Sequence, residues 1–497
     1  MRGKIHSIAG LPVRVAIIYA LLFTFAFWFY SIMWVNAPVM GLDSGSYMRA
    51  AREFSDFRLD QLQERAPGYP LLLMLTGSTQ SPTRRLFFVS LLLHFGAIWL
   101  LANVLNRAGP SEIMLTLFGF LLLLPPYVES AAYVLTENLT EAILVTVFIG
   151  LVLWYLNDQT VWLIISSITI GFSALTRPTY QLLALAVLFY LSILRCLFPS
   201  ATLNWRRVAY AGLILVTSSA VIVGGYAFYN YRNFGYFTVT PKFGLTLSLK
   251  TAHFVERLPD EYADIRKVLV EARDNELLTS PLHRGNIYIW SAVPSLKKLT
   301  GLEVPELSDY MLRLNILLIK QAPLSFLEDV VSAFGSFALP SSGKLANFDS
   351  RIFQLIWGVF NFGLMGGVAL NLTVLLGAMF LFAMSRLRHC NFGESLNELH
   401  VLFSQGIVYG LAATIVAYTA LISCVFEVGD PRYRVPTDSL IMFMLFLGCQ
   451  LCCRLVNLVR LGDVSPSLSR EEKLGSQVAR SIHETSSSIQ NDSPPPV

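Results

Sequence analysis

Long, continuous apolar runs are the feature that most constrains this chain. They recur along most of its 497 residues and do not alternate with polar positions. Lipid offers the backbone no hydrogen-bond partners, so a chain crosses a membrane only as helices or as a closed barrel. Continuous runs are typical of helices. Only 14% of the residues are charged, against about 25% in soluble domains. We therefore expect an all-α polytopic membrane protein.

The apolar runs also set the number of spans. A transmembrane helix needs about 20 apolar residues, although short or tilted spans are tolerated. On this basis we predict about ten transmembrane helices. The third, fifth and sixth are short enough to be half-helices or tightly turned pairs. The ten segments are 13–35, 86–107, 111–126, 139–157, 161–176, 179–197, 208–230, 355–385, 402–426 and 437–460.

Basic residues in the short loops predict the orientation, because cytoplasmic loops are enriched in Lys and Arg. With ten spans these loops all fall on one side, so both termini are expected in the cytoplasm. The residues are Arg2, Lys4, Arg14, Arg107, Arg195, Arg206, Arg207, Arg386, Arg388, Arg454 and Arg460. The extracytoplasmic side then receives 36–85, 127–138, the turn at Arg177, 231–354 and 427–436.

Four regions follow from this layout. They are a transmembrane core at 1–230 with its first extracytoplasmic loop at 36–85, an extracytoplasmic helical region at 231–354, C-terminal transmembrane helices at 355–464, and a disordered cytoplasmic tail at 465–497. The region 231–354 is too long to be structureless. We expect helices in it at 259–276, 306–321 and 324–338. The last two are amphipathic and would lie on the membrane surface or cap the helical core.

The first extracytoplasmic loop combines a carboxylate with an arginine. Asp43 precedes a predicted helix at 44–54 and could be only its N-cap, but a carboxylate here can also activate a hydroxyl. Tyr47 lies one turn further along the same helix face. Arg65 begins the rigid turn Arg65-Ala66-Pro67-Gly68-Tyr69-Pro70. Arg65 and Tyr69 are either interfacial anchors or ligands of a phosphate.

Further polar residues lie at span ends on the same side. Glu137 either begins the fourth span, where the helix dipole favours a carboxylate, or belongs to a site. Arg177 is isolated in a tight turn, so we expect a partner such as Glu137 or a bound anion. Arg232 ends the seventh span beside interfacial tyrosines. Arg432 and Tyr433 lie in a short loop with two carboxylates and two arginines, which could be merely a surface ion-pair cluster.

The chain resembles the GT-C superfamily of polytopic glycosyltransferases. Within that superfamily it is similar to the branch that includes the protein O-mannosyltransferases and the bacterial aminoarabinose transferases to lipid A. The resemblance rests on six ordered pieces, none of them specific alone. They are Asp43-Ser44-Gly45-Ser46-Tyr47, Arg65 to Pro70, Thr136-Glu137, Leu175 to Pro178, Arg232-Asn233 and Arg432 to Pro436. The chain departs from the family at Ser44, where members often carry a second acidic residue. It also has Arg65-Ala66-Pro67 where the aminoarabinose branch has Lys-Pro-Pro.

Members of this superfamily transfer a sugar from a polyprenyl-phosphate donor to an acceptor at an extracytoplasmic site. The resemblance implies that Asp43 is the catalytic carboxylate, and that Arg65 and Tyr69, with Arg177 or Arg232, hold the donor phosphate. It implies a glycan, lipid or protein acceptor, contact with membrane lipids, and a bacterial inner membrane with the site facing the periplasm. The remaining candidates for substrate binding are Tyr47, Glu137, Arg432 and Tyr433.

Other classes of function are weighed against this one. The net charge of +4 and the lack of a basic run give no reason to expect a nucleic-acid partner. We expect no metal and no cofactor. A transporter or flippase of a lipid-linked sugar is an alternative that would need polar residues across the membrane midplane. A non-catalytic scaffold subunit is another. Either gains if the candidate residues lie far apart.

Overall fold

The computed structural model describes residues 10–41, 43–58, 65–197, 203–279, 288–338, 351–387 and 395–456. These residues form helices and no β-strand, apart from one isolated bridge between Val39 and Tyr133. The expected all-α class is therefore confirmed for the described part. The tail predicted at 465–497 lies outside the described residues, as do Arg2, Lys4, Arg388 and Arg460.

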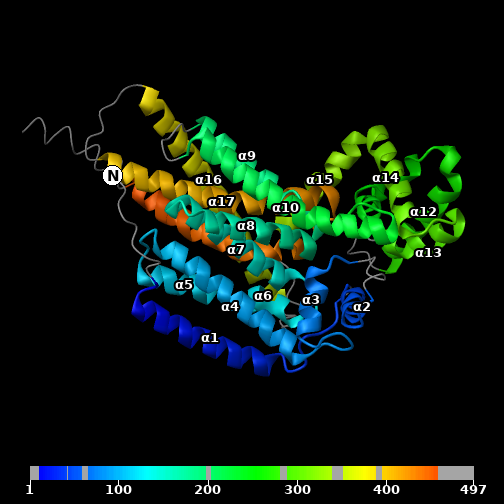
Figure 1. Cartoon of the computed structure of the whole chain (residues 1–497), viewed down its shortest axis with the longest axis horizontal. Helices are drawn as coiled ribbons and strands as arrows, with labels where there is room; N and C mark the ends of the chain where they lie inside the picture. Colours follow the sequence, from blue (N-terminus) through cyan, green and yellow to red (C-terminus); the bar gives the residue numbers. More distant parts are fainter. Residues whose placement is uncertain are drawn as a thin grey trace, which may run out of the picture. The chain divides into compact units, whose positions relative to one another are not determined.

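Eight helical segments in the described part are long and apolar enough to cross a membrane, as expected of a multi-pass membrane protein (Figure 1). They are α1 (Val13–Met33), α4 (Arg84–Asn106), α7 (Glu137–Asn157), the segment Pro178–Leu197 that contains α9 (Leu183–Leu197), α10 (Trp205–Phe234), Leu355–Val374 within α16 (Arg351–Leu387), Val401–Phe426 within α17 (Ser395–Phe426), and Pro431–Val456.

Two of the ten predicted segments are not long straight helices. The third consists of α5 (Glu112–Leu122) and a piece at Pro125–Ala132 made of α6 (Pro125–Val128) and η2 (Glu129–Ala132), bent by 59°. Two prolines at the break explain the bend. The fifth is α8 (Thr160–Thr176), of 17 residues. Length and composition therefore support eight spans, or nine with the bent pair.

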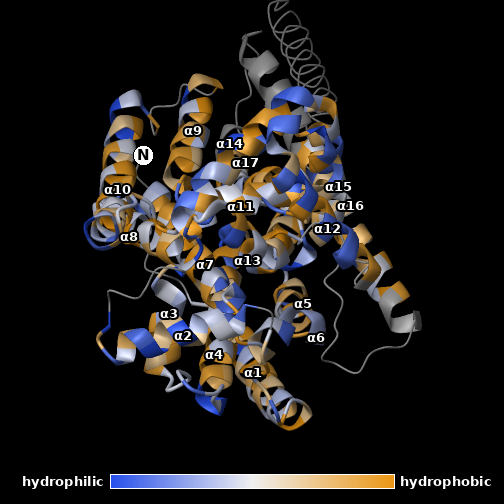
Figure 2. Cartoon of the chain, turned by 90° about the vertical axis from the view of Figure 1, so that its right-hand side faces the viewer, coloured by the Kyte–Doolittle hydropathy of each residue, from blue (hydrophilic) through white to orange (hydrophobic). Residues whose placement is uncertain are grey.

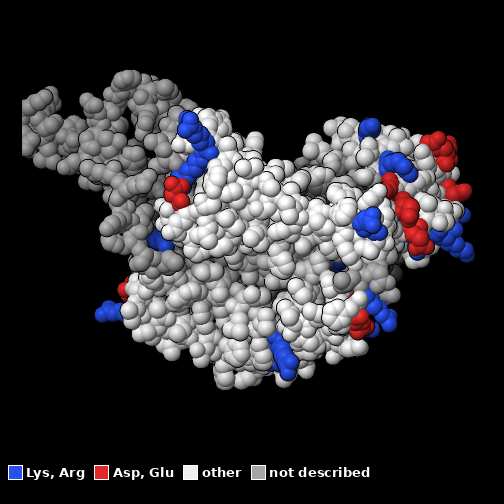
Figure 3. Space-filling view, in the orientation of Figure 1, with Lys and Arg blue, Asp and Glu red and all other residues white. Residues whose placement is uncertain are grey.

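The surface of the spans is apolar. Figure 2 shows hydrophobic residues along the helices, and on the face seen in Figure 3 the charged side chains gather toward the ends with few between them. Val13, Ile17 and Leu21 of α1 are each more than half exposed and follow one another at helical spacing. Such a stripe is stable only in an apolar surrounding.

The chain divides into two compact units, one of Met1–Leu370 with Val408–Leu447 and the other of Asn371–Ile407 with Gly448–Val497. Every candidate site residue belongs to the first unit. Within it, α7 packs between α4 and α8, and α8 packs against α10. Two short helices, α2 (Ser44–Ser55) and α3 (Gly68–Leu75), pack on each other. They lie at the same end of the spans as α12 (Ala263–Thr279) and α13 (Ile289–Thr300) (Figure 1).

The region after α10 contains five helices with a hydrophobic core of their own. They are α11 (Phe243–Leu247), α12 (Ala263–Thr279), α13 (Ile289–Thr300), α14 (Val304–Gln321) and α15 (Pro323–Ala338). The three helices predicted from the sequence coincide with α12, α14 and α15. The short α11 and α13, which is interrupted by Pro294, were not predicted.

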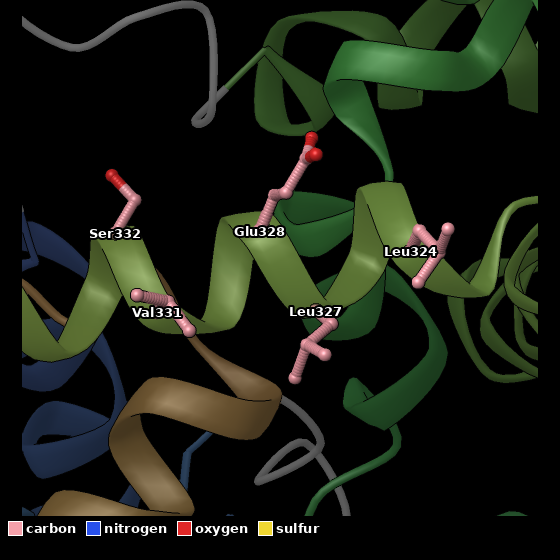
Figure 4. Close-up of a pocket in the computed structure, with 5 residues that line it drawn as sticks. All are labelled: Leu324, Leu327, Glu328, Val331 and Ser332. Carbon is pink, nitrogen blue, oxygen red and sulfur yellow. The ribbon is translucent and has the colours of Figure 1, made fainter.

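The helix α15 has two distinct faces. Leu324, Leu327 and Val331 are exposed and line a shallow pocket together with Glu328 and Ser332 (Figure 4). Its buried face carries Asp329, which forms an ion pair with the fully buried Lys250. The Lys250 Nζ also donates to the Asp329 carbonyl at 3.3 Å. A charge pair buried in an apolar core thus fixes the rotation of α15.

Candidate functional site

The loop after α1 is fixed to the segment that precedes α7. The backbone N–H of Val39 donates to Ala132 at 2.8 Å, and that of Val134 donates to Val39 at 3.0 Å. The buried Ser44 hydroxyl then donates to the Val134 carbonyl at 2.8 Å. These bonds hold Asp43, the residue before Ser44, close to the first turn of α7.

Arg65 joins Asp43 from the start of α3. Its Nη2 donates to Asp43 Oδ1 at 2.6 Å, and its Nε donates to the Ser46 hydroxyl at 2.8 Å. The guanidinium also lies over the Tyr47 ring, 4.4 Å from the ring centre. Tyr47 in turn meets Tyr69 edge to face, with ring centres 5.2 Å apart. The two pieces of the first loop therefore lie together, as the sequence predicted.

Arg432 joins the same carboxylate from the other end of the chain. Its Nη2 donates to Asp43 Oδ2 at 2.7 Å, and its Nε donates to Glu137 Oε1 at 2.7 Å. These partners are 389 and 295 residues away in sequence. Asp43 thus bridges two arginines, with one oxygen on each. One of these partners, Glu137, is only 1% exposed, so the ion pairs of this loop extend below the surface.

The position of Arg432 depends on a second arginine two residues later. Arg434 is 2% exposed and donates to Asp438 at 2.7 Å, to the Ala338 carbonyl at 2.9 Å and to Asn361 at 3.1 Å. It thereby ties the loop to the helix at 438–456, to the end of α15 and to α16. We interpret Arg434 as the structural anchor and Arg432 as the residue presented to the site.

Arg177 lies beside this network without joining it. It follows α8, is 8% exposed, and its guanidinium lies over the Tyr433 ring at 5.2 Å. Within the described part of the chain its side chain forms no hydrogen bond or ion pair, and Nη1 is fully enclosed. The suggested Glu137 partner bonds to Arg432 instead. Burial lowers the pKa of Arg177, but nearby negative groups, Glu137 foremost, raise it overall, so it stays cationic.

The two arginines dominate the chemistry of Asp43. Burial raises the pKa of its carboxyl, but the charges and hydrogen bonds of Arg65 and Arg432 lower it from 3.8 to about 2. Asp43 does occupy the N-cap position of α2, yet its side chain makes no capping hydrogen bond. The N-cap interpretation of the carboxylate is therefore wrong. With this low pKa the Asp43 carboxyl is ionised and weakly basic at neutral pH.

Glu427 is a site residue that sequence reasoning did not select. It follows α17, and burial raises the pKa of its carboxyl despite the opposing charges of Arg177 and Arg432 and a hydrogen bond from Tyr433. The signal for it was a carboxylate in the same charge-rich loop as Arg432. Arg232, in contrast, is exposed in the last turn of α10, and no ion pair or side-chain hydrogen bond among the described residues joins it to the cluster.

The assembled site contains three arginines and three carboxylates, drawn from five separate parts of the chain. They are Arg65, Arg177 and Arg432 with Asp43, Glu137 and Glu427. Among the residues described, no group of three or more His, Cys, Asp or Glu is arranged to hold a metal ion. Fixed guanidiniums at the end of apolar helices can bind an anion attached to a lipid.

Comparison with known proteins adds no name to this site. No family model matches the chain, and no curated protein matches its sequence.

Proposed function

We propose that the chain is a glycosyltransferase of the GT-C type. It moves a sugar from a polyprenyl-phosphate donor to a lipid, glycan or protein acceptor on the extracytoplasmic side of a bacterial inner membrane. The observation that carries the proposal is the Asp43 carboxylate held between Arg65 and Arg432 at one end of a bundle of apolar helices. The scaffold alternative leaves this convergence without a purpose.

The donor phosphate takes the position of the Asp43 carboxylate on the arginines. Carboxylates and phosphates are both bound by guanidinium groups through pairs of short, charge-assisted hydrogen bonds. Arg65 and Arg432 already donate to the two oxygens of one anion at 2.6 and 2.7 Å. A phosphate monoanion offers the same spacing of acceptors. The polyprenyl chain lies along the apolar surface of the spans.

Phosphate binding also makes Asp43 a usable base. The low pKa of Asp43 is due to the two guanidiniums, while burial acts to raise it. Once a phosphate neutralises Arg65 and Arg432, the burial and the added negative charge both raise the pKa of the carboxyl. Asp43 therefore becomes able to accept a proton only when the donor is bound.

In the proposed transfer step one bond forms at the anomeric carbon of the sugar and one breaks. The acceptor oxygen or nitrogen forms a bond to the anomeric carbon, and the bond between that carbon and the phosphate oxygen breaks. The electron pair of the broken bond leaves with the polyprenyl phosphate, whose growing charge is stabilised by Arg65 and Arg432. The proton of the acceptor goes to the Asp43 carboxylate.

The test uses the full chain in lipid vesicles with a polyprenyl-phosphate sugar labelled in the sugar and a membrane extract that supplies lipid, glycan and protein acceptors. We expect label to leave the donor lipid, and Arg65→Met to reduce the rate by at least about a hundredfold. Arg266→Met is the matched control, because Arg266 pairs with the exposed Asp260 far from the site. Undiminished transfer by the Arg65 variant would refute the proposal, and so would a wild-type chain that never releases the sugar.

A second candidate function is transport of a lipid-linked sugar across the membrane. It is favoured by a polar pair within the spans, where His94 of α4 meets Glu141 of α7 at 2.7 Å and the Leu122 carbonyl at 3.0 Å. Ionisable groups inside spans often mark a path for ions or substrates. Movement of intact labelled lipid between leaflets, lost in Glu141→Gln and without release of free sugar, would favour transport over transfer.

A further inference from the structure

Four polar atoms beside Arg432 are enclosed and lack a hydrogen-bond partner. They are Tyr69 Oη, Glu137 Oε2, Arg177 Nη1 and Glu427 Oε2. Tyr69 and Glu137 are each 1% exposed and Arg177 is 8% exposed. The Leu135 backbone N–H lies near the Tyr69 oxygen, which leaves the Tyr69 O–H without an acceptor, and Tyr433 reaches the Glu427 carboxyl but leaves Oε2 unpaired.

These four atoms belong to one neighbourhood. Glu137 acts electrostatically on both Tyr69 and Arg177, and Arg177 acts on Glu427. The residues come from α3, from the first turn of α7, and from the ends of α8 and α17. Enclosed groups without partners are destabilising, so folded proteins rarely gather them in one place. Their convergence points to a ligand that completes the hydrogen bonds.

The types of atom restrict the chemistry of that ligand. Tyr69 and Arg177 offer donors, whereas Glu137 and Glu427 offer acceptors. A phosphate oxygen only accepts and an ammonium only donates, so either would leave half of the group unpaired. A hydroxyl both donates and accepts. Neighbouring hydroxyls on one ring would satisfy donors and acceptors together.

We propose that Tyr69, Glu137, Arg177 and Glu427 form a subsite for the hydroxyl groups of a neutral sugar. This inference rests on the proposed function and assigns the sugar of the donor to these four residues, with the phosphate held by Arg65 and Arg432. Glu137 bonds through its other oxygen to Arg432, which holds the phosphate position. The subsite is therefore adjacent to the phosphate, where the attached sugar ring must lie.

Two probes separate sugar binding from phosphate binding. The full chain in lipid nanodiscs is titrated with a sugar-free polyprenyl phosphate and with the same lipid phosphate carrying a neutral hexose. Tyr69→Phe removes only the unpaired hydroxyl. We expect about 3- to 10-fold weaker binding of the hexose-bearing lipid, binding of the sugar-free lipid within about twofold, and no loss of thermal stability.

Tyr127→Phe is the matched control. Tyr127 is buried in α6, and its hydroxyl is likewise enclosed without a partner, but it lies outside the site. This change should leave both affinities as they are. Arg65→Met should weaken both probes together, because Arg65 binds the phosphate.

The outcomes distinguish the two levels of the proposal. One outcome refutes the sugar subsite and leaves the phosphate site standing. In it, the sugar-free lipid binds and Arg65→Met weakens that binding. Tyr69→Phe and Glu427→Gln, however, change the affinities for both lipids equally or change neither. Tighter binding of an amino sugar than of every neutral hexose would refute the hydroxyl assignment. If neither probe binds the wild-type chain, the proposed function fails as well.

Discussion

Asp43→Asn should separate substrate binding from turnover. In the free protein the Asp43 carboxylate is the anion that Arg65 and Arg432 hold, so a donor phosphate must displace it. The asparagine side chain of the variant is nearly the same size as the Asp43 carboxylate, but it carries no charge and cannot accept a proton as a base. We therefore expect this variant to bind polyprenyl phosphate more tightly than the wild type while losing transfer.

The size of the effect follows from the pKa of Asp43. The shift from 3.8 to about 2 corresponds to at most about 2.4 kcal/mol, at 1.36 kcal/mol per unit. The side chain is 31% exposed, so solvent screening reduces this to roughly 1–2 kcal/mol. Without that competition, affinity for the lipid phosphate rises roughly 5- to 30-fold. Loss of the proton acceptor slows transfer by roughly 10²- to 10⁴-fold.

The assay pairs titration of polyprenyl phosphate in nanodiscs with transfer from a labelled donor. A depressed carboxyl pKa contributes stability that is complete above the ordinary 3.8 and is lost as the pH falls toward 2. Binding at neutral pH therefore compares a fully ionised Asp43 with a neutral amide. Asp158→Asn is the control, because Asp158 pairs with Arg207 at the far end of α7. Weaker lipid-phosphate binding in Asp43→Asn, or transfer at the wild-type rate, would refute the reasoning.

Three other changes test separate parts of the structure. An alanine at Gly68 would place its Cβ 2.5 Å from the Thr176 hydroxyl, so Gly68→Ala should shift α3, lower the free energy of unfolding by roughly 1–3 kcal/mol and weaken lipid-phosphate binding; wild-type values for both would contradict this. Lys250→Met leaves the buried Asp329 with only His253, 3.6 Å away, and should lower the free energy of unfolding by roughly 3 kcal/mol. Adding Asp329→Leu should restore most of that loss, and a double variant no more stable than the single one would argue against a buried pair. Burial raises the pKa of Glu427 above its ordinary 4.5, so the ionised form opposes folding at high pH and this penalty fades as the pH falls through the raised pKa. Glu427→Gln should therefore raise the melting temperature at neutral pH but have little effect near about pH 4; equal melting temperatures at neutral pH would contradict the assignment.

The fold class and the local part of the site could be predicted from the sequence. Continuous apolar runs permit little except membrane helices. Asp43, Tyr47 and Arg65 are close in the chain, and a helix followed by a proline-rich turn brings such neighbours together. Span length was harder to predict, because the prolines that bend the third segment act through the backbone and leave its apolar composition unchanged.

The pairings across the chain could not be predicted. The sequence indicated that Glu137, Arg177 and Arg432 lie on one side, but their partners depend on how the spans pack. Glu137 bonds to Arg432 because Arg434 fixes that loop. Arg232 was a reasonable candidate by motif, yet it lies exposed at the end of α10. Orphaned atoms such as Glu427 Oε2 become visible only once the surroundings are known.

The bridge between Asp43 and Arg432 has a consequence for biogenesis. A ribosome makes Asp43 early and Arg432 close to the end, with most of the helices threaded in between. During that interval Asp43 has Arg65 but not Arg432 as a partner, and the proposed catalytic centre is incomplete. Under the proposed function, transfer can begin only after the segment that carries Arg432 has been made, so a product truncated before that segment would be inserted and inert.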